Sequence, residues 1–298
     1  ALRGNLMDEP GDRRSHAVAT PRGGGIAIVL VVLLAGLYLL PWRSSLPALW
    51  LGFLPGLLFV AGIGWWDDHR PLSPWLRLAI QAVASLMLAI GAGWYSGHWL
   101  PAVVAFGSAM VLVNVWNFMD GINGLAVTQA GLAAAGYAAV LSGGWHWLAL
   151  GLLAACAGFL PFNFPKARIF LGDVGSGALG FALAGLLTAA LISAPVATAP
   201  LLILPLCVFL VDAGFTLTRR ILCNEQWWTP HVTHVYQRAA RRFGHTTITL
   251  VYATMSAVTL ALMIGWSHVT LSQSVWVVVV AYSVVSLCWF AARSGLRE

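Results

Sequence analysis

Carboxylate and amide side chains gather at the edges of apolar stretches in this chain. The positions are Asp67 and Asp68, then Asn114, Asn117, Asp120 and Asn123, and later Asn163 and Asp173. Charged and amide groups beside membrane helices are costly unless they meet partners, so we interpret these as functional. Their oxygens suit a hard cation such as Mg2+, whereas the four cysteines show no CxxC or His/Cys spacing for zinc and indicate no disulfide.

Asp67 and Asp68 follow the apolar residues 47–66, at the carboxyl end of a predicted helix whose dipole already repels anions. Two adjacent carboxylates also repel each other, and a cation or a proton relay is the usual compensation. The alternative is a solvated helix end whose charge is balanced by Arg70. We favour the functional interpretation, because acids at the membrane are functional by default.

The segment 114–124, NVWNFMDGING, ends another apolar stretch. Asn114 and Asn117 are three positions apart and share a helix face. Asp120 follows, and Gly121 and Gly124 let the backbone turn before the next helix. The alternative is a polar turn that caps two helices.

Asp173 lies in the glycine-rich segment LGDVGSG, residues 171–177, just before a predicted helix over residues 176–192. Backbone amides at the start of a helix bind anions, and Lys166 and Arg168 add cationic donors for phosphate. The alternative is that Asp173 is only the N-cap of this helix.

A longer polar loop carries His231 and His234, followed by arginines at 238, 241 and 242. A membrane-surface amphipathic segment would explain the arginines without catalysis, but it does not explain the paired histidines. The sequence leaves an active-site loop and a membrane anchor as equal alternatives. Near the N-terminus, Arg22 and the glycines at 23–25 offer an arginine and close backbone approach to the same site.

Ten apolar stretches have to position these groups: residues 23–40, 47–66, 76–94, 99–115, 122–141, 147–162, 176–192, 196–218, 247–266 and 275–292. With 59% hydrophobic and 9% charged residues, the 298-residue chain has too little polar surface for a soluble globule. The stretches approach the roughly 20 residues that a spanning helix needs. We predict an all-α integral membrane protein, a polytopic bundle of about ten transmembrane helices.

The polar gaps that carry charge fall on one side of the predicted bundle, and Arg43 is the one basic residue in a gap on the other side. Because Lys and Arg mark the cytoplasmic side, we predict a cytoplasmic-face active site. The net charge of +6 reflects this bias; it would also suit membrane lipids or phosphorylated substrates, and no nucleic acid is expected. Residues 1–298 are expected to form a single membrane-embedded domain, with residues 219–246 as a cytoplasmic loop within it.

Together these segments resemble the polyprenyl-phosphate N-acetylhexosamine-1-phosphate transferases, of the glycosyltransferase family 4 type. The motifs are SH...PRGGG at 15–25, the Asp pair, NxxNFxDGxxG at 114–124, FNxP...FxGDxGS at 162–176 and the histidine loop, in the family's order. The histidine loop is most similar to WbpL- and WecA-like enzymes and less so to the HHH loop of the related MraY. It departs from the usual HRSHxYQ pattern at Val232 and Thr233.

The resemblance implies transfer of a sugar-1-phosphate from a UDP-N-acetylhexosamine to undecaprenyl phosphate with release of UMP. This step would initiate O-antigen or other cell-envelope glycan synthesis at the bacterial inner membrane. The resemblance also implies that Asp173 and Asn117 hold Mg2+, with Mn2+ as a substitute, and that Asp67 and Asp68 orient or deprotonate the lipid phosphate. The other implied substrate contacts are Asn123, Asn163 and Phe170 for the nucleotide, His231, His234 and Lys166 for the diphosphate, Arg22 or Arg77 for the lipid phosphate, and Asn114 and Asp120 elsewhere in the site.

Other interpretations remain. A membrane transporter or channel could place acids near helix ends to form an ion path, but no inverted repeat is visible in the sequence. A CDP-alcohol phosphotransferase would need a DxxDGxxAR signature, which is absent. Relatives carry one more helix before the segment with Ser15 and His16, so the chain is expected to lack an N-terminal transmembrane helix, and a homodimer is compatible with the sequence.

Overall fold

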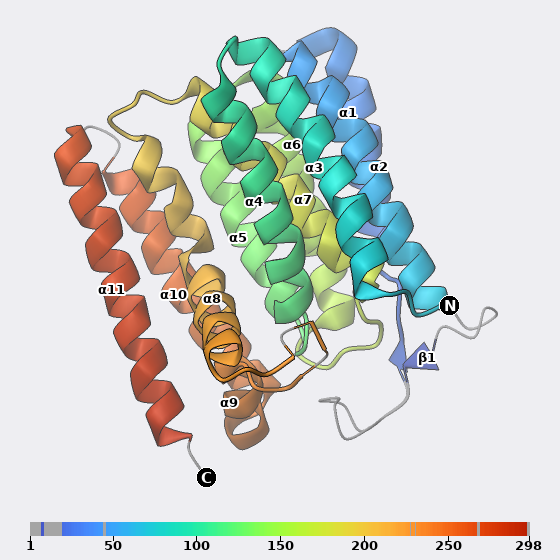
Figure 1. Cartoon of the computed structure of the whole chain (residues 1–298), viewed down its shortest axis with the longest axis vertical. Helices are drawn as coiled ribbons and strands as arrows, with labels where there is room; N and C mark the ends of the chain where they lie inside the picture. The colour runs from blue at the N-terminus through green and yellow to red at the C-terminus, as the bar shows by residue number, and fades with distance from the viewer. Residues whose placement is uncertain are drawn as a thin grey trace.

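The computed structural model describes residues 7–8, 20–43, 46–226, 228–229, 231–266 and 269–296, so Ser15 and His16 of the N-terminal motif lie outside the described residues. Within them the protein is a bundle of helices (Figure 1). The helices are α1 (Ile26–Arg43), α2 (Pro47–His69), α3 (Pro74–Ser96), α4 (Trp99–Met119), α5 (Leu125–Val140), α6 (Gly143–Asn163), α7 (Gly172–Ser193), the 3-10 helix η1 (Ala199–Leu206), α8 (Cys207–Leu222), α9 (Val235–Phe243), α10 (His245–Gly265) and α11 (Leu271–Gly295). Two short strands, β1 (Met7–Asp8) and β2 (Thr20–Pro21), pair antiparallel.

The helices confirm the prediction of a polytopic all-α membrane protein. Eight helical segments are long and apolar enough to cross a membrane, and two shorter apolar helices, Ile26–Leu40 and Leu125–Val140, are also present in the described chain. Eight and two together match the ten predicted stretches. Each spanning helix is apolar on most of its surface because it meets either lipid or another apolar helix.

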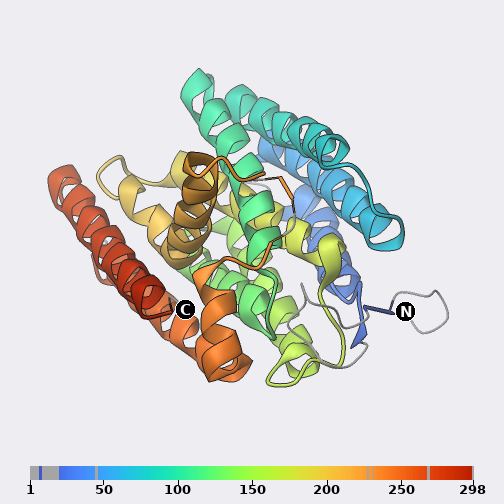
Figure 2. The same cartoon turned by 60° about the horizontal axis from the view of Figure 1, so that its bottom comes forward.

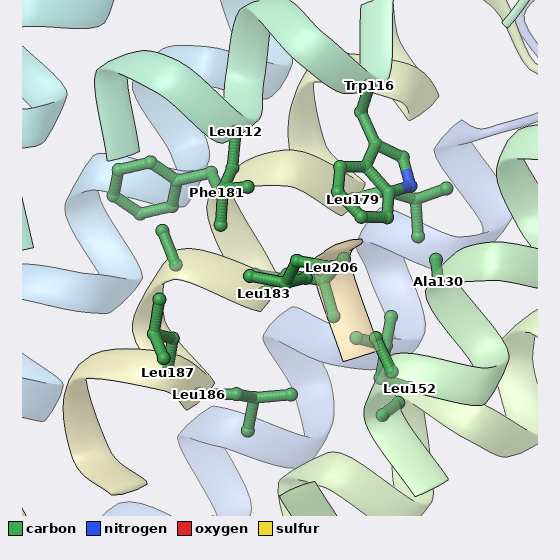
Figure 3. Packing of buried hydrophobic residues seen from close by; sticks show 14 of the residues in the cluster. Leu112, Trp116, Ala130, Leu152, Leu179, Phe181, Leu183, Leu186, Leu187 and Leu206 are labelled. Atoms are coloured by element: carbon green, nitrogen blue, oxygen red, sulfur yellow. The ribbon is translucent and has the colours of Figure 1, made fainter. Parts of the chain in front are cut away.

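Helix α7 forms the centre of the bundle, and 89% of its most apolar stretch is buried. Its side chains pack against Leu112 and Trp116 of α4 and against residues of α5 and α6 (Figure 3). Gly180 of α7 lies against the backbone at Leu112, where a Cβ would overlap the carbonyl group. Small residues allow this close approach, and it brings the end of α4 beside the start of α7.

The predicted stretch 196–218 is not one α-helix. It begins as the 3-10 helix η1 and continues as α8, with Pro205 near the junction. A proline within a helix has no N–H to donate and crowds the preceding turn, which accounts for the irregular start.

The loop predicted over residues 219–246 is shorter than expected, because α8 extends to Leu222 and α10 begins at His245. The loop contains the short helix α9, which packs against α8, α10 and α11. Figure 2 turns this end of the bundle toward the viewer, and the orange segment after α8 crosses over it near the end of α4. The ends of α2 and α4, the start of α7 and this loop therefore share one end of the molecule.

Candidate active site

The adjacent acids Asp67 and Asp68 lie in the last turn of α2, but their carboxylates have different partners. Asp68 is buried, and its two oxygens accept the backbone N–H groups of Asp173 at 3.0 Å and of Val174 at 3.1 Å. These amides belong to the first turn of α7, whose N-cap residue, Leu171, makes no side-chain cap. Asp68 therefore caps α7 from another helix, and the positive end of the α7 dipole compensates an acid at the end of α2.

Asp173 lies inside the first turn of α7. The helix begins at Gly172, earlier than predicted, and the cap comes from Asp68, so the interpretation of Asp173 as a mere N-cap is wrong. Its side chain is 34% exposed and meets Arg77 and Asn117. Its carboxylate is thus available to substrate groups in a way that the carboxylate of Asp68 is not.

Arg77, in the first turn of α3, joins two of the acids. Its Nη1 donates to Asp67 Oδ2 at 2.7 Å and to Asp173 Oδ2 at 3.2 Å. Asp67 Oδ1 accepts the backbone N–H of Leu72 at 2.6 Å, which fixes the turn between α2 and α3. One cation therefore lies between two carboxylates and offsets their repulsion.

The shared face predicted for Asn114 and Asn117 is confirmed, because both line a narrow groove among α2, α3 and α4. Asn117 Nδ2 donates to Asp173 Oδ1 at 3.1 Å and to Ser176 Oγ at 3.2 Å. Asn114 Nδ2 donates instead to Gln81 Oε1 at 2.9 Å. Apolar side chains on the same groove are Val60, Ile63, Leu78 and Val113.

Asp120 follows α4 and lies close to the histidine loop. Burial, and then the charges of nearby aspartates, raise the pKa of Asp120 well above its usual value, which favours the protonated carboxyl. The next residue, Gly121, leaves room for the Tyr236 hydroxyl, which a Cβ would overlap. That hydroxyl donates to the Phe118 carbonyl oxygen at 2.9 Å and fastens α9 to the end of α4.

His231 and His234 lie side by side, with stacked rings whose centroids are 4.9 Å apart. His234 is only 2% exposed, whereas His231 is partly exposed and its Nδ1 lies 3.0 Å from Thr233 Oγ1. Burial, and then the charges of His234 and Arg220, lower the pKa of His231 to about 4. This lowered pKa favours the neutral imidazole, which can donate one ring N–H as a hydrogen bond.

A cleft of about 310 Å³ brings many of the predicted residues together. Those on its lining are Arg77, Asn117, Asp120, Asp173, His231 and His234. The groove along α4 opens onto the same groups, because Arg77, Asn117 and Asp173 line both spaces. The cleft and the groove thus meet at these three residues.

Some predicted residues line neither the cleft nor the groove: Arg22, Asp67, Asp68, Asn123, Asn163, Lys166 and Phe170. Asn163 is buried, and both ends of its amide bond to backbone groups, at 2.8 and 2.9 Å. Asn123 donates to a backbone carbonyl at 3.0 Å, and Lys166 is exposed. Arg22 donates to the backbone oxygen of Asp68 at 2.8 Å, so it reaches the Asp pair through the main chain.

The cleft also contains residues that the sequence analysis did not name as part of a site: Phe118, Trp228, Thr229, Tyr236 and Gln237. Tyr236 and Gln237 lie two and three positions after His234, and this proximity in the sequence was the available signal. Trp228 carries no comparable signal, because its role depends on a neighbour far along the chain: its ring centroid lies 6.3 Å from that of Trp75 in α3.

The groups around Asp173 fit a hard divalent cation. Asp173 and Asn117 touch, and an amide flip would turn the Asn117 oxygen toward the same point. Among the described residues no three or more His, Cys, Asp or Glu side chains are grouped to hold a metal ion. Water and substrate phosphates would complete the coordination sphere, as is usual for Mg2+.

Comparisons with known proteins give a consistent picture. Residues 50–191 match the family described as glycosyl transferase family 4. The chain is 32% identical over 211 residues to a decaprenyl-phosphate N-acetylglucosaminephosphotransferase of Mycobacterium leprae, covering 58% of this chain and 52% of the relative. It is 29% identical over 262 residues to a probable undecaprenyl-phosphate N-acetylglucosaminyl 1-phosphate transferase of Bacillus subtilis, covering 80% and 70%.

A third relative is a phospho-N-acetylmuramoyl-pentapeptide-transferase of Lactiplantibacillus plantarum, 27% identical over 60% of this chain and 64% of the relative. The chain spans about half the length of the mycobacterial relatives that it matches. The family match at residues 50–191 includes the cleft residues Arg77, Asn117 and Asp173 but ends before the histidine loop.

Proposed function

The chain carries a glycosyl transferase family 4 domain at residues 50–191, and from this premise we propose that the protein is a phosphoglycosyl transferase. It transfers a sugar-1-phosphate from a UDP-N-acetylhexosamine to a polyprenyl phosphate, undecaprenyl phosphate in our proposal, and releases UMP. The observation that carries the proposal is the cleft in which Arg77, Asn117 and Asp173 face two stacked histidines. The relatives named above are transferases acting on such substrates, and none of the three is named as a transporter or channel.

We place the phosphate of the acceptor lipid at the groove among α2, α3 and α4, where the guanidinium of Arg77 can meet it. The groove has a volume of about 60 Å³, so the isoprenoid chain would extend beyond it. Asn114 lies along the same groove. The lipid phosphate would then lie beside Asp67, which is ion-paired with Arg77.

The donor fits the polar cleft, with its diphosphate between Asp173 and the histidine loop. His231 and His234 offer ring N–H groups to the phosphates, and Asp120 lines the same space. The proposed contacts of the nucleotide or diphosphate also include Asn123, Asn163, Lys166 and Phe170. For these four the cleft gives no support, because they do not line it.

We propose that Asp173 and Asn117 hold Mg2+, with Mn2+ as a substitute, and that the ion when bound neutralises charge on the diphosphate. The protein's own groups supply the rest. Asp67 orients or deprotonates the lipid phosphate, whose oxygen attacks the donor's β-phosphorus as the bond to the UMP oxygen breaks. Positioning and charge neutralisation account for most of the rate in phosphoryl transfer.

We further propose that the chain forms one membrane-embedded domain and that its cleft faces the cytoplasm of a bacterial inner membrane. This arrangement is compatible with a homodimer. The support is the charge bias: the segments at the cleft end of the bundle carry Arg70, Arg77, Lys166, Arg168 and the arginines at 219, 220, 238, 241 and 242, whereas Arg43 ends α1 on the opposite side. The product would serve O-antigen or other cell-envelope glycan synthesis.

One experiment tests both activity and sidedness. Vesicles from expressing cells, supplied with undecaprenyl phosphate, are expected to release UMP from one or more members of a UDP-N-acetylhexosamine panel. Inside-out vesicles should do so directly, and right-side-out vesicles only after permeabilisation. No UMP from any donor would reject the activity, and equal release from intact right-side-out vesicles would reject the topology.

Substitutions in the histidine loop test whether it binds the donor or anchors the protein to the membrane. If the two histidines bind the donor, His234→Ala should lower kcat/KM for the UDP-sugar by about 10²-fold, because hydrogen-bond donors to the developing charge are lost. The KM for the lipid should hardly change. A triple Arg238→Ala, Arg241→Ala, Arg242→Ala variant should instead show salt-sensitive effects on lipid substrate or membrane binding.

Steady-state kinetics on the two variants distinguish the alternatives. Arg238 and Arg242 also bond to backbone carbonyls at the end of α11, at 2.8 and 3.3 Å, so the thermal stability of the triple variant is the necessary control. Identical, purely lipid-dependent defects in both variants would mean that the loop is a membrane anchor and no part of the active site.

A further inference from the structure

A buried carboxylate behind the histidine loop has an unusual number of partners. Asp212 of α8 is 1% exposed and makes no contact with either the cleft or the groove. Its oxygens accept hydrogen bonds from Val235 N at 3.1 Å, Tyr236 N at 3.1 Å, Tyr252 Oη at 2.7 Å, Trp289 Nε1 at 3.0 Å and Thr216 Oγ1 at 3.2 Å. Because five donors bond to its two oxygens, the carboxylate is held in one orientation.

Two of these donors are the first backbone amides of α9. The residue at the N-cap position of α9 is His234, whose side chain makes no cap. Asp212 therefore satisfies the amides that an N-cap side chain would normally satisfy, with one bond to each of its two oxygens. Because the cap comes from α8, the ring of His234 is free to line the cleft.

The bonds from Asp212 to α9 also determine the surroundings of the His234 ring. The His234 Nδ1 lies 3.8 Å from Asp212 Oδ1, too far for a hydrogen bond, and the ring stacks on His231. Tyr236, whose amide bonds to Asp212, places its hydroxyl on the Phe118 carbonyl oxygen at the end of α4. Any movement of the start of α9 would therefore displace the cleft wall on which both histidines lie.

We propose that Asp212 is a positioning residue for the histidine loop, a role that rests on the proposed function of the cleft. It fastens the start of α9 to α8 and so sets where His234 and Tyr236 stand relative to Asp173. Its bonds from Tyr252 of α10 and Trp289 of α11 hold the carboxylate in place for this task.

Asp212→Asn tests the proposal, because the amide keeps one acceptor oxygen and turns an NH2 group toward one of the α9 amides. We expect kcat to fall by about 10²-fold, as for a displacement of about 1 Å in an active site, with the KM for undecaprenyl phosphate unchanged. Hydrogen exchange, followed by mass spectrometry, should be faster in the peptide that contains residues 235 and 236. Thr216→Val is the control: it removes a donor to the same carboxylate from within α8 and should alter neither kcat nor this exchange.

A second pair of variants leaves the buried carboxylate in place. Val235 is the first residue of α9, where proline is tolerated, and His234 before it has φ −60° and ψ 146°, which a following proline accepts. Val235→Pro deletes one N–H bond to Asp212, while Val235→Ala keeps it and loses the side chain. We expect Val235→Pro to lower kcat below that of Val235→Ala and to speed exchange at Tyr236.

Equal kcat and exchange in these two variants would overturn the proposal, and so would unchanged exchange in folded Asp212→Asn. Loss of activity in Thr216→Val equal to that in Asp212→Asn would mean that the carboxylate only joins helices. Hydrogen exchange does not depend on turnover. If the wild-type protein releases no UMP, the proposed function fails while the exchange result still decides whether Asp212 holds α9.

Discussion

Replacing Asp173 by Asn is expected to lower kcat by about 10³-fold or more, because a divalent cation at this carboxylate would supply several kcal/mol of charge stabilisation and each ~1.4 kcal/mol is tenfold in rate. Asn has nearly the same shape but no charge to offer a cation or Arg77. The protein should nevertheless stay folded. Asp68 caps α7, so the substitution leaves the start of that helix intact.

UMP release measured across a Mg2+ titration, with thermal unfolding of the purified protein, checks this expectation. Ser176→Ala is the matched control: it removes the Oγ that accepts from Asn117 at 3.2 Å but leaves the Asp173 carboxylate in place. Its activity should stay within a few-fold of wild type. Near-normal turnover of Asp173→Asn at any Mg2+ concentration would mean that Asp173 binds no catalytic cation.

The number of membrane helices and the end of the bundle that carries the site could be predicted, because both follow from local properties of the sequence. Length and hydrophobicity decide which segments enter the bilayer, and short polar gaps carry the charge. The neighbours of each helix could not be predicted this way. A helix that is apolar on nearly all sides presents no polar face from which its packing can be inferred, and α7 after Ser176 is of this kind.

The site was predicted where residue type alone implies chemistry, as for Asp173, Asn117 and His234, which all line the cleft. It was not predicted where a role depends on a distant partner. Asp68 looked unfavourable at a helix end until α7, more than a hundred residues later, supplied the amides that it caps. Asp212 stands out in the sequence as an acid within the apolar stretch 196–218, but its role could not be predicted, since its α9 partners come from a separate loop.

Single substitutions of Asp67 and Asp68 should have different consequences, although the sequence alone does not distinguish the two residues. Asp67→Asn keeps an oxygen for one of its partners, Leu72 or Arg77, and loses the charge that we propose acts on the lipid phosphate. We expect kcat to fall by about 10²-fold, as when a general base or its electrostatic partner is removed, with little change in stability. Asp68→Asn turns an NH2 group toward one of two α7 amides, so we expect a loss of about 1–3 kcal/mol in the free energy of unfolding.

Measuring kcat at saturating UDP-sugar and lipid together with thermal unfolding of each variant separates the two roles. Asp68 has both oxygens occupied by α7, so a proton taken from the lipid phosphate would have to displace one of these bonds. Asp67 is held by one flexible arginine and one loop amide, and it can exchange the arginine for substrate. If Asp68→Asn instead lowered kcat with unchanged stability while Asp67→Asn had wild-type kcat, the base would be Asp68, and α7 would have to release it during turnover.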